Sequence, residues 1–169
     1  MAVTIQSAVA LAQLTPAEKR VAERLVAGAS NIQGARELGM STGTFASHVA
    51  SIGRKFQITS RSGRPARANA VLDSEQVAPP PAPASAPQLT AADLRLLRAY
   101  AKYPETPDIA RAAGIAQAEV RPQIKKLIAE TGADNATHLI GLAHAWNLLG
   151  KGRNGTNPSV ETAKPAGTA

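Results

Sequence analysis

The sequence of 169 residues contains no cysteine. A disulfide or a cysteine-ligated zinc ion therefore cannot stabilise its fold, and the cysteine content gives no support for secretion. Histidine occurs three times, and aromatic residues make up only 3% of the chain. No Gly-rich phosphate loop, nucleophile elbow or paired carboxylate is recognisable. The sequence therefore predicts a protein that is not an enzyme, with no cofactor, no bound metal and no small-molecule ligand.

Long apolar runs are also missing. The opening segment MAVTIQSAVALAQ is apolar, but it is short and has no basic start, so it resembles neither a signal peptide nor a membrane span. We therefore expect a cytoplasmic protein that contacts no membrane.

Positive charge is what the chain has in excess. It carries 19 Lys and Arg against 12 Asp and Glu, a net charge of +7, which favours a polyanionic partner such as nucleic acid. A basic surface that is merely solvated is the alternative. Nine basic and three acidic residues lie between positions 14 and 72, but seven and six between 89 and 149. Attraction to phosphate is therefore expected mainly in the first of these segments.

Composition divides the chain into four parts. Residues 73–88 contain five prolines, which disfavour a helix and favour an extended linker. Residues 150–169 contain almost no large apolar side chain and are expected to form a disordered tail. Two candidate domains remain, at 14–72 and 89–149. An extended linker of that length would span roughly 50 Å at about 3.1 Å per residue, enough for both domains to reach adjacent half-sites on one duplex.

The two candidate domains resemble each other. A shift of 75 residues aligns them without a gap, and apolar positions then match apolar positions. The clearest matches are Leu14-Thr15 with Leu89-Thr90, Arg20 with Arg95, Ala35-Arg36 with Ala110-Arg111, and Gly39 with Gly114. We infer a tandem repeat.

Each repeat is predicted to consist of short helices, and no segment alternates as a strand would. Thr15 followed by Pro16 and Glu18 is a capping box, Ser30 and Ser41 can cap the next two helices, and Gly39 can form the turn between them. In the second repeat the corresponding helices are expected from Thr90, from about Pro107 and from Gln117. The predicted fold is thus all-α, with two small domains of short helices; the family resemblance described below implies four helices in each.

A short helix, a glycine turn and a longer helix form a helix-turn-helix arrangement. Over residues 42–56, Phe45, Val49, Ile52 and Phe56 fall on one stripe, which must face the core. The opposite side is the one that would enter a DNA major groove. It comprises Gly43, Ser47, Ala50, Ser51 and Arg54.

The motifs LTPAEKRV, GASNIQGARELGMS and TFASHVASIGRKFQITSRS resemble the LuxR/NarL-type four-helix DNA-binding domain along its length. The second repeat, with LTAAD, DIARAAGI and TGADNATHLI, resembles it more distantly. The resemblance implies base contacts by Ala46, Ser47 and Ala50. It implies phosphate contacts by a larger set: Ser30, Asn31, Thr44, His48, Arg54, Lys55 and Arg61.

Thr42, Ser51 and Arg64 complete the expected DNA-binding set of the first repeat. Long polar side chains common in the family are replaced here by Ala46, Ala50 and Ile32. Specificity would then depend on a few hydroxyls, thymine-methyl contacts and DNA shape.

The corresponding face of the second repeat is more cationic. Its candidate DNA contacts are Arg121, Gln123, Lys125 and Lys126, although a merely solvated face is a serious alternative. Pro122 is expected to kink or delay this helix. At the position of the second repeat that corresponds to Thr44, the chain has Glu119.

The last apolar segment, residues 136–149, carries more apolar surface than a small domain needs. We expect a dimer or partner interface at Leu139, Leu142, Ala143 and Trp146, because the family commonly dimerises through its fourth helix. The counterpart in the first repeat appears short and broken by Gly63 and Pro65, with Arg61, Arg64 and Arg67 as a backbone-binding flank.

The sequence therefore predicts a transcription regulator that binds double-stranded DNA through tandem helix-turn-helix domains. One alternative is a DNA-tethered interaction protein whose second domain mediates homodimerisation or contacts RNA polymerase or a sigma factor. Another is an architectural protein with little sequence preference. A DNA-binding protein of either kind would be associated with the nucleoid.

Overall fold

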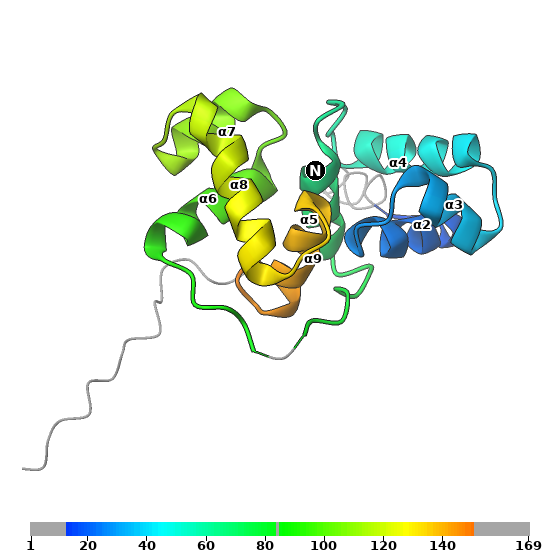
Figure 1. Cartoon of the computed structure of the whole chain (residues 1–169). Helices are drawn as coiled ribbons and strands as arrows, with labels where there is room; N and C mark the ends of the chain where they lie inside the picture. Colours follow the sequence, from blue (N-terminus) through cyan, green and yellow to red (C-terminus); the bar gives the residue numbers. More distant parts are fainter. Residues whose placement is uncertain (1–12, 84, 151–169) are drawn as a thin grey trace, which may run out of the picture.

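The computed structural model describes residues 13–83 and 85–150, and these contain eight α-helices and no strand. The first half comprises α2 (Pro16–Val26), α3 (Asn31–Leu38), α4 (Thr42–Lys55) and α5 (Arg64–Asp73). The second half comprises α6 (Ala91–Lys102), α7 (Thr106–Ala113), α8 (Gln117–Thr131) and α9 (Ala136–Ala145) (Figure 1). The expected all-α fold is confirmed. The predicted tail falls, from residue 151 onward, outside the described residues.

Side-chain caps begin most of the helices where the sequence predicts them. The hydroxyl of Thr15 accepts a hydrogen bond from the backbone amide of Glu18 at 3.2 Å, and the hydroxyl of Thr90 accepts one from the backbone amide of Asp93 at 3.1 Å. Both helices have complete capping boxes. Ser30 and Ser41 cap α3 and α4 in the same way. Such caps stabilise a helix by about 1 kcal/mol each, because they satisfy amides that have no partner within the helix.

The helix-turn-helix turn has the same backbone in both halves. Gly39 ends α3 with φ 66° and Gly114 ends α7 with φ 70°. This left-handed conformation favours glycine, which has no β-carbon to clash with the following carbonyl. The amide of the residue after each glycine donates a hydrogen bond to an equivalent carbonyl. Met40 donates to Ala35 at 3.0 Å, and Ile115 donates to Ala110 at 3.1 Å.

The helix positions support the internal repeat for three helices out of four. The shift from Pro16 to Ala91, from Asn31 to Thr106 and from Thr42 to Gln117 is 75 residues each time. The fourth helix is shifted by only 72 residues, from Arg64 to Ala136. The gap-free register is therefore wrong at this point, because the loop that precedes α9 is shorter than the loop that precedes α5.

The two halves are packed against each other and share one hydrophobic core. Figure 1 shows α5 and α9 side by side at the centre, with α2, α3 and α4 on one side and α6, α7 and α8 on the other. Helix α9 also packs on α2. Buried apolar side chains from both halves belong to a single cluster, among them Val71 and Leu72 from α5, and Leu139 and Ile140 from α9.

The described residues 73–83 and 85–88 do not form the expected free spacer. Val77 and Pro80 are buried, and Pro80 lies against α9, where a β-carbon on Gly141 would be 2.8 Å from its ring. The halves therefore do not move apart on an extended linker. The expectation that they reach two half-sites independently is wrong, because apolar burial holds them together.

Two expectations about proline are also wrong. Helix α8 begins at Gln117 and continues through the exposed Pro122, so Pro122 does not delay it. Pro65 lies in the first turn of α5, where the missing amide hydrogen costs nothing, and it begins that helix rather than breaking it. Within the described residues, no helix combines the length and the apolar character that crossing a membrane requires.

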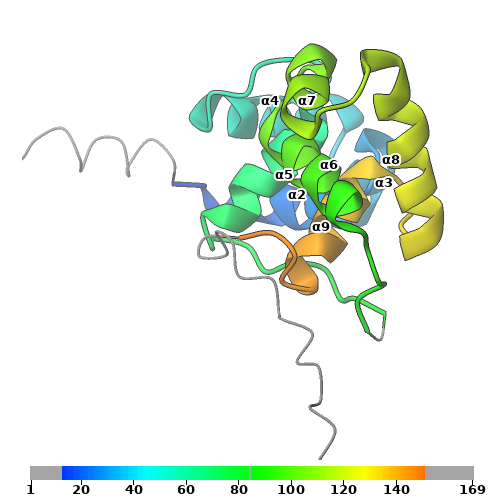
Figure 2. The ribbon, with the colours of Figure 1, turned by 90° about the vertical axis from the view of Figure 1, so that its left-hand side faces the viewer.

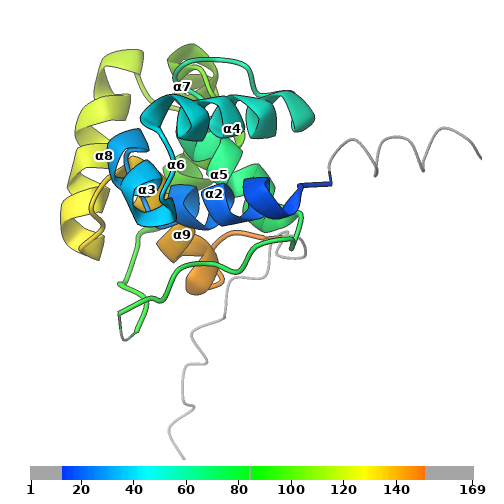
Figure 3. The same cartoon turned by 90° about the vertical axis from the view of Figure 1, so that its right-hand side faces the viewer.

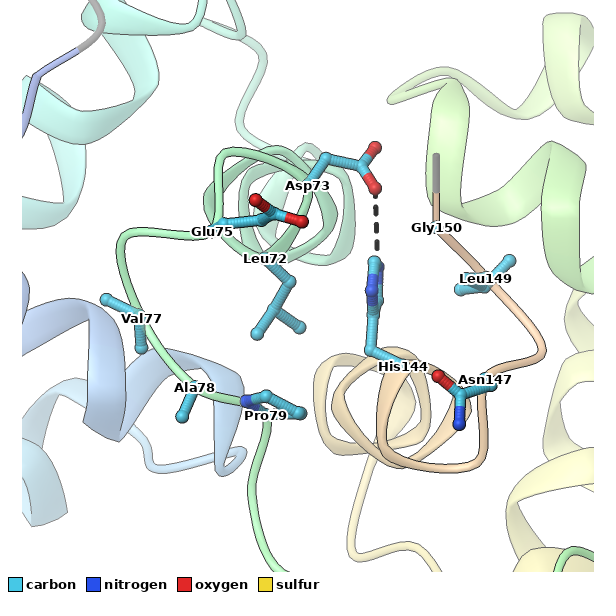
Figure 4. A pocket seen from close by; sticks show the side chains of 10 residues that line it. All are labelled: Leu72, Asp73, Glu75, Val77, Ala78, Pro79, His144, Asn147, Leu149 and Gly150. Atoms are coloured by element: carbon cyan, nitrogen blue, oxygen red, sulfur yellow. Dashed lines mark ion pairs between the residues drawn. The ribbon is translucent and has the colours of Figure 1, made fainter. Parts of the chain in front are cut away.

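A histidine forms part of the contact between α5 and α9. His144 Nε2 lies 2.8 Å from Asn69 Oδ1. It also lies 4.0 Å from a carboxylate oxygen of Asp73, and Figure 4 marks this ion pair. Its side chain is only 8% exposed. Burial lowers the pKa of the imidazole from its ordinary 6.5, and the nearby carboxylate of Asp73 opposes this only in part. The neutral form is thus the one that fits the folded chain.

We expect the free energy of unfolding to decrease as the pH falls below about 6.5. The unfolded chain binds a proton at His144 more readily than the folded chain does, so protonation favours unfolding. Denaturant unfolding of wild type and of His144→Gln at a series of pH values tests this. The decrease in the free energy of unfolding between neutral and mildly acidic pH should be smaller in the variant. Equal decreases in both proteins would contradict the assignment of the pH dependence to His144.

Candidate nucleic-acid interface

Helix α4 is held by its apolar side against α2 and α3. Phe45, Val49 and Ile52 are buried, as the periodicity predicts. The approach of α3 is close, because a β-carbon on Gly34 would lie 2.4 Å from the Phe45 ring. The opposite face of α4 is left open to solvent.

The open face of α4 is small and polar. Thr42, Gly43, Thr44, Ser47 and Arg54 are exposed. Four further residues are half-buried beside them: Ala46, His48, Ala50 and Ser51. The hydroxyls of Ser41 and Thr44 lie 2.8 Å apart at the start of the helix. The structure thus brings together most of the residues predicted for the DNA contact of the first repeat, and Arg54 is the exposed cation among them.

Lys55 has a structural partner. Its Nζ lies 2.6 Å from the Glu18 carboxylate and 3.0 Å from the Gln13 carbonyl oxygen. The Glu18 side chain is only 5% exposed and also accepts hydrogen bonds from the Thr15 amide and the Ser51 hydroxyl. Lys55 therefore ties α4 to α2, and the expectation of a free phosphate-binding cation at this position is wrong.

The charge state of Glu18 follows from these bonds. Burial alone would raise the pKa of the Glu18 carboxyl, but hydrogen bonds from Lys55 and Thr15 outweigh burial and hold the pKa below its ordinary value. The carboxylate is therefore charged at neutral pH and keeps the Lys55 ammonium in place. The capping box is visible in the sequence, but the bonds to Ser51 and Lys55 depend on how α2 packs on α4, and no local pattern indicates them.

Arg64 and Arg67 are also tied into the fold. The guanidinium of Arg64 donates to Asn31 Oδ1 at 2.8 Å and to the Ala29 carbonyl at 2.6 Å. Arg67 donates to the carbonyls of Ile58 and Ser60. Both side chains hold loops of the first half in place, which corrects their assignment to a free backbone-binding flank.

Arg61 and Ser30 remain accessible. Both are exposed, although the Ser30 hydroxyl is engaged as the cap of α3. Nearby Ile32 is 63% exposed, the one large apolar side chain of that exposure among the described residues. This exposed apolar side chain lies in the first turn of α3, at a position where the family resemblance implies a long polar side chain.

Helix α8 presents the cationic face expected of the second half. Arg121, Lys125 and Lys126 are exposed, while Val120, Ile124 and Leu127 face the core. Lys126 lies 3.6 Å from Glu130, and the Gln123 amide donates to Glu119 at 3.2 Å. Because these partners are exposed, the contacts contribute little to stability and are easily exchanged.

The apolar face of α9 is covered by the same chain. Leu139, Leu142 and Ala143 are each 1% exposed, packed where α9 meets α5 and α2. Trp146 is half-buried, and its indole nitrogen lies 3.4 Å from the Pro83 carbonyl. The prediction that these residues meet a second molecule is therefore wrong for the three buried ones, since their apolar surface is already used between the halves.

Helices α4 and α8 lie on different sides of the α5–α9 pair. In Figure 2, α8 forms the right-hand edge of the molecule and α4 lies at the upper left. Figure 3 shows α4 running across the upper part of the molecule and α8 running down its left edge. Both helices are accessible, but they face different directions.

Comparison with known proteins gives a family-model match for part of the chain. No curated protein and no solved structure matches significantly. The family model described as bacterial regulatory proteins, luxR family, matches residues 12–63. That range contains α2, the turn at Gly39 and all of α4, which confirms the resemblance for the first repeat and leaves the second as a prediction. Residues 12–63 are thus similar to the luxR-family model, and the match ends before α5.

Proposed function

We propose that the protein is a transcription regulator that binds double-stranded DNA, with α4 as the helix that enters the major groove. The observation that carries this proposal is the open face of α4, with Ser47 and Arg54 on a helix fixed by a glycine turn within the luxR-family segment. A helix mounted in this way fits the width of the major groove of about 12 Å.

The residues divide by role. Ala46, Ser47 and Ala50 would approach the base edges, with the alanines contacting thymine methyl groups. Ser51, whose hydroxyl donates to Glu18, would act indirectly. The backbone phosphates would be held by a surrounding set: Ser30, Asn31, Thr42, Thr44, His48, Arg54 and Arg61. Lys55 and Arg64 would act indirectly, by keeping α4 and the start of α3 in position.

The second half would add a weaker contact. Its α7–turn–α8 arrangement has the same glycine turn, and Arg121, Gln123, Lys125 and Lys126 would meet phosphates. The excess of basic over acidic residues is smaller here than in the first half, so less of the affinity is expected from this face.

A low-specificity architectural role is the second candidate. It is favoured by the small side chains at Ala46 and Ala50, which leave few hydrogen-bonding groups for direct base readout. Such a protein would coat DNA through phosphate contacts and shape, without a preferred site.

Binding of the full chain to a pool of genomic fragments at several salt concentrations distinguishes the two. A regulator should enrich particular fragments and keep a preference of about a thousandfold or more over random DNA at physiological salt. Enrichment of no fragment, with affinity falling steeply as salt rises, would favour the architectural role. No binding at low salt would refute both.

A further inference from the structure

The two helix-turn-helix arrangements are fixed in place relative to each other. The Asn135 side chain at the start of α9 donates to the Gly28 carbonyl, after α2, at 2.7 Å. His144 of α9 contacts Asn69 of α5, and Gly141 lies directly against the end of α2. Together with the shared core, these contacts pack the two halves against each other.

This fixed arrangement places the two outer faces in different directions. Helix α4 packs on α2 and α3, so its buried side faces its own half. Helix α8 packs on α6 and α7 of its own half and on α9 at the centre of the molecule. Figures 2 and 3 show the two helices at different edges of the molecule and running crosswise. The two helices therefore do not lie side by side on one side of the molecule.

A single straight duplex does not match this arrangement. Two recognition helices that share one duplex must face the same side and lie about 34 Å apart, one helical turn of DNA. DNA is stiff over about 150 base pairs, so wrapping a short duplex around the molecule would require sharp bending. Two separate duplexes need no bending.

We propose that the chain bridges two DNA duplexes, one held by α4 and the other by α8. This inference rests on the proposed function, because it requires that the first half binds DNA. It differs from coating or from binding a pair of half-sites, since a single folded chain joins two segments that are distant in sequence or belong to different molecules.

Charge supports two unequal contacts. Arg54 and Arg61 are exposed in the first half, and Arg121 and Lys125 in the second, with no ion pair for these four among the residues that the structure describes. Lys126 can exchange its exposed partner Glu130 for a phosphate. Each face thus carries free cations, but the second half has fewer in excess of its acidic residues. The second duplex should be held more weakly and released first as salt rises.

The test uses the full-length protein, a short biotinylated duplex on beads and a second, fluorescent duplex in solution. The beads should retain fluorescent DNA only when protein is present. Recovery should pass through a maximum as protein increases, because excess protein occupies each duplex separately. Binding to the fluorescent duplex alone is measured in parallel by anisotropy, and light scattering gives the mass of the free protein.

The variant Lys125→Glu should reduce recovery roughly tenfold, with a much smaller loss of affinity in the anisotropy measurement. Arg95→Glu, on the exposed side of α6, makes the same change in net charge and is the matched control. It should recover nearly as much fluorescent DNA as wild type. Circular dichroism spectra should show that both variants keep their helical content.

Three results would overturn the bridging proposal. The first is a wild-type protein that binds the single duplex but retains no second duplex on the beads. The second is full recovery of fluorescent DNA by Lys125→Glu, which would mean that protein dimers bridge the duplexes instead. Equal losses in Lys125→Glu and Arg95→Glu would show a general charge effect. If wild type binds no duplex at all, the proposed function itself fails together with the inference.

Discussion

Arg54→Glu is expected to weaken binding of the full chain to its preferred DNA fragment roughly 100-fold, a loss of about 2–3 kcal/mol. Arg54 is the exposed cation on the open face of α4, near the end of that helix. Reversal removes a phosphate or base contact and adds repulsion from the DNA backbone. Fluorescence anisotropy with the fragment, at one fixed salt concentration, measures the change.

Arg95→Glu serves again as the control, because it changes the net charge equally but lies on α6. Its loss of affinity should be no more than about threefold, as expected for a distant screened charge. Lys55→Glu is unsuitable as a test, since Lys55 is bonded to the buried carboxylate of Glu18 and its reversal would damage the packing of α2 on α4. Equal losses in the Arg54 and Arg95 variants would rule out α4 as the binding helix.

Gly141→Ala is expected to lower the free energy of unfolding by about 3 kcal/mol. The added β-carbon would lie 2.3 Å from the Val26 carbonyl oxygen, which belongs to the backbone at the end of α2. Helices α2 and α9 would have to separate, and the contact between the halves would loosen. Denaturant unfolding followed by circular dichroism measures this, and wild type should unfold in one transition because the halves share a core.

Gly43→Ala provides the matched control. Gly43 also lies within a helix, but the nearest atom to its added β-carbon would be the Ser41 hydroxyl oxygen at 4.0 Å. Alanine is the better helix former, so this variant should be as stable as wild type or more stable by about 0.5 kcal/mol. A Gly141→Ala protein as stable as wild type would show that α9 does not approach α2 as closely as the structure indicates.

The local structure was largely predictable because its signals are local. Thr15 with Glu18, and Thr90 with Asp93, begin helices through hydrogen bonds that span only three residues. Gly39 and Gly114 mark turns that glycine adopts most easily. The stripe of Phe45, Val49 and Ile52 follows from helical geometry alone, and therefore so does the identity of the open face of α4.

The role of each cation was less predictable, because exposure depends on partners far away in the sequence. Lys55 and Arg54 are adjacent, but Lys55 points to Glu18, 37 residues away, while Arg54 stays in solvent. Arg64 similarly reaches Asn31, 33 residues away. Composition and spacing do not distinguish an arginine that holds a loop from one that is free to meet a phosphate.

The sequence by itself determined most of the helices, the caps at Thr15, Ser30, Ser41 and Thr90, and the glycine turns, since each depends on residues within a few positions. The internal repeat, which rests on a comparison of the chain with itself, stays a prediction. Only the tertiary structure decided where the apolar face of α9 is buried. Leu139 and Leu142 form a stripe that would suit a second molecule equally well, but α5 and α2 of the same chain cover it. The physical reason is that hydrophobic burial is non-directional. An apolar stripe shows that a helix face must be covered, but it does not show which partner covers that face. That covering, in turn, sets the directions in which α4 and α8 face.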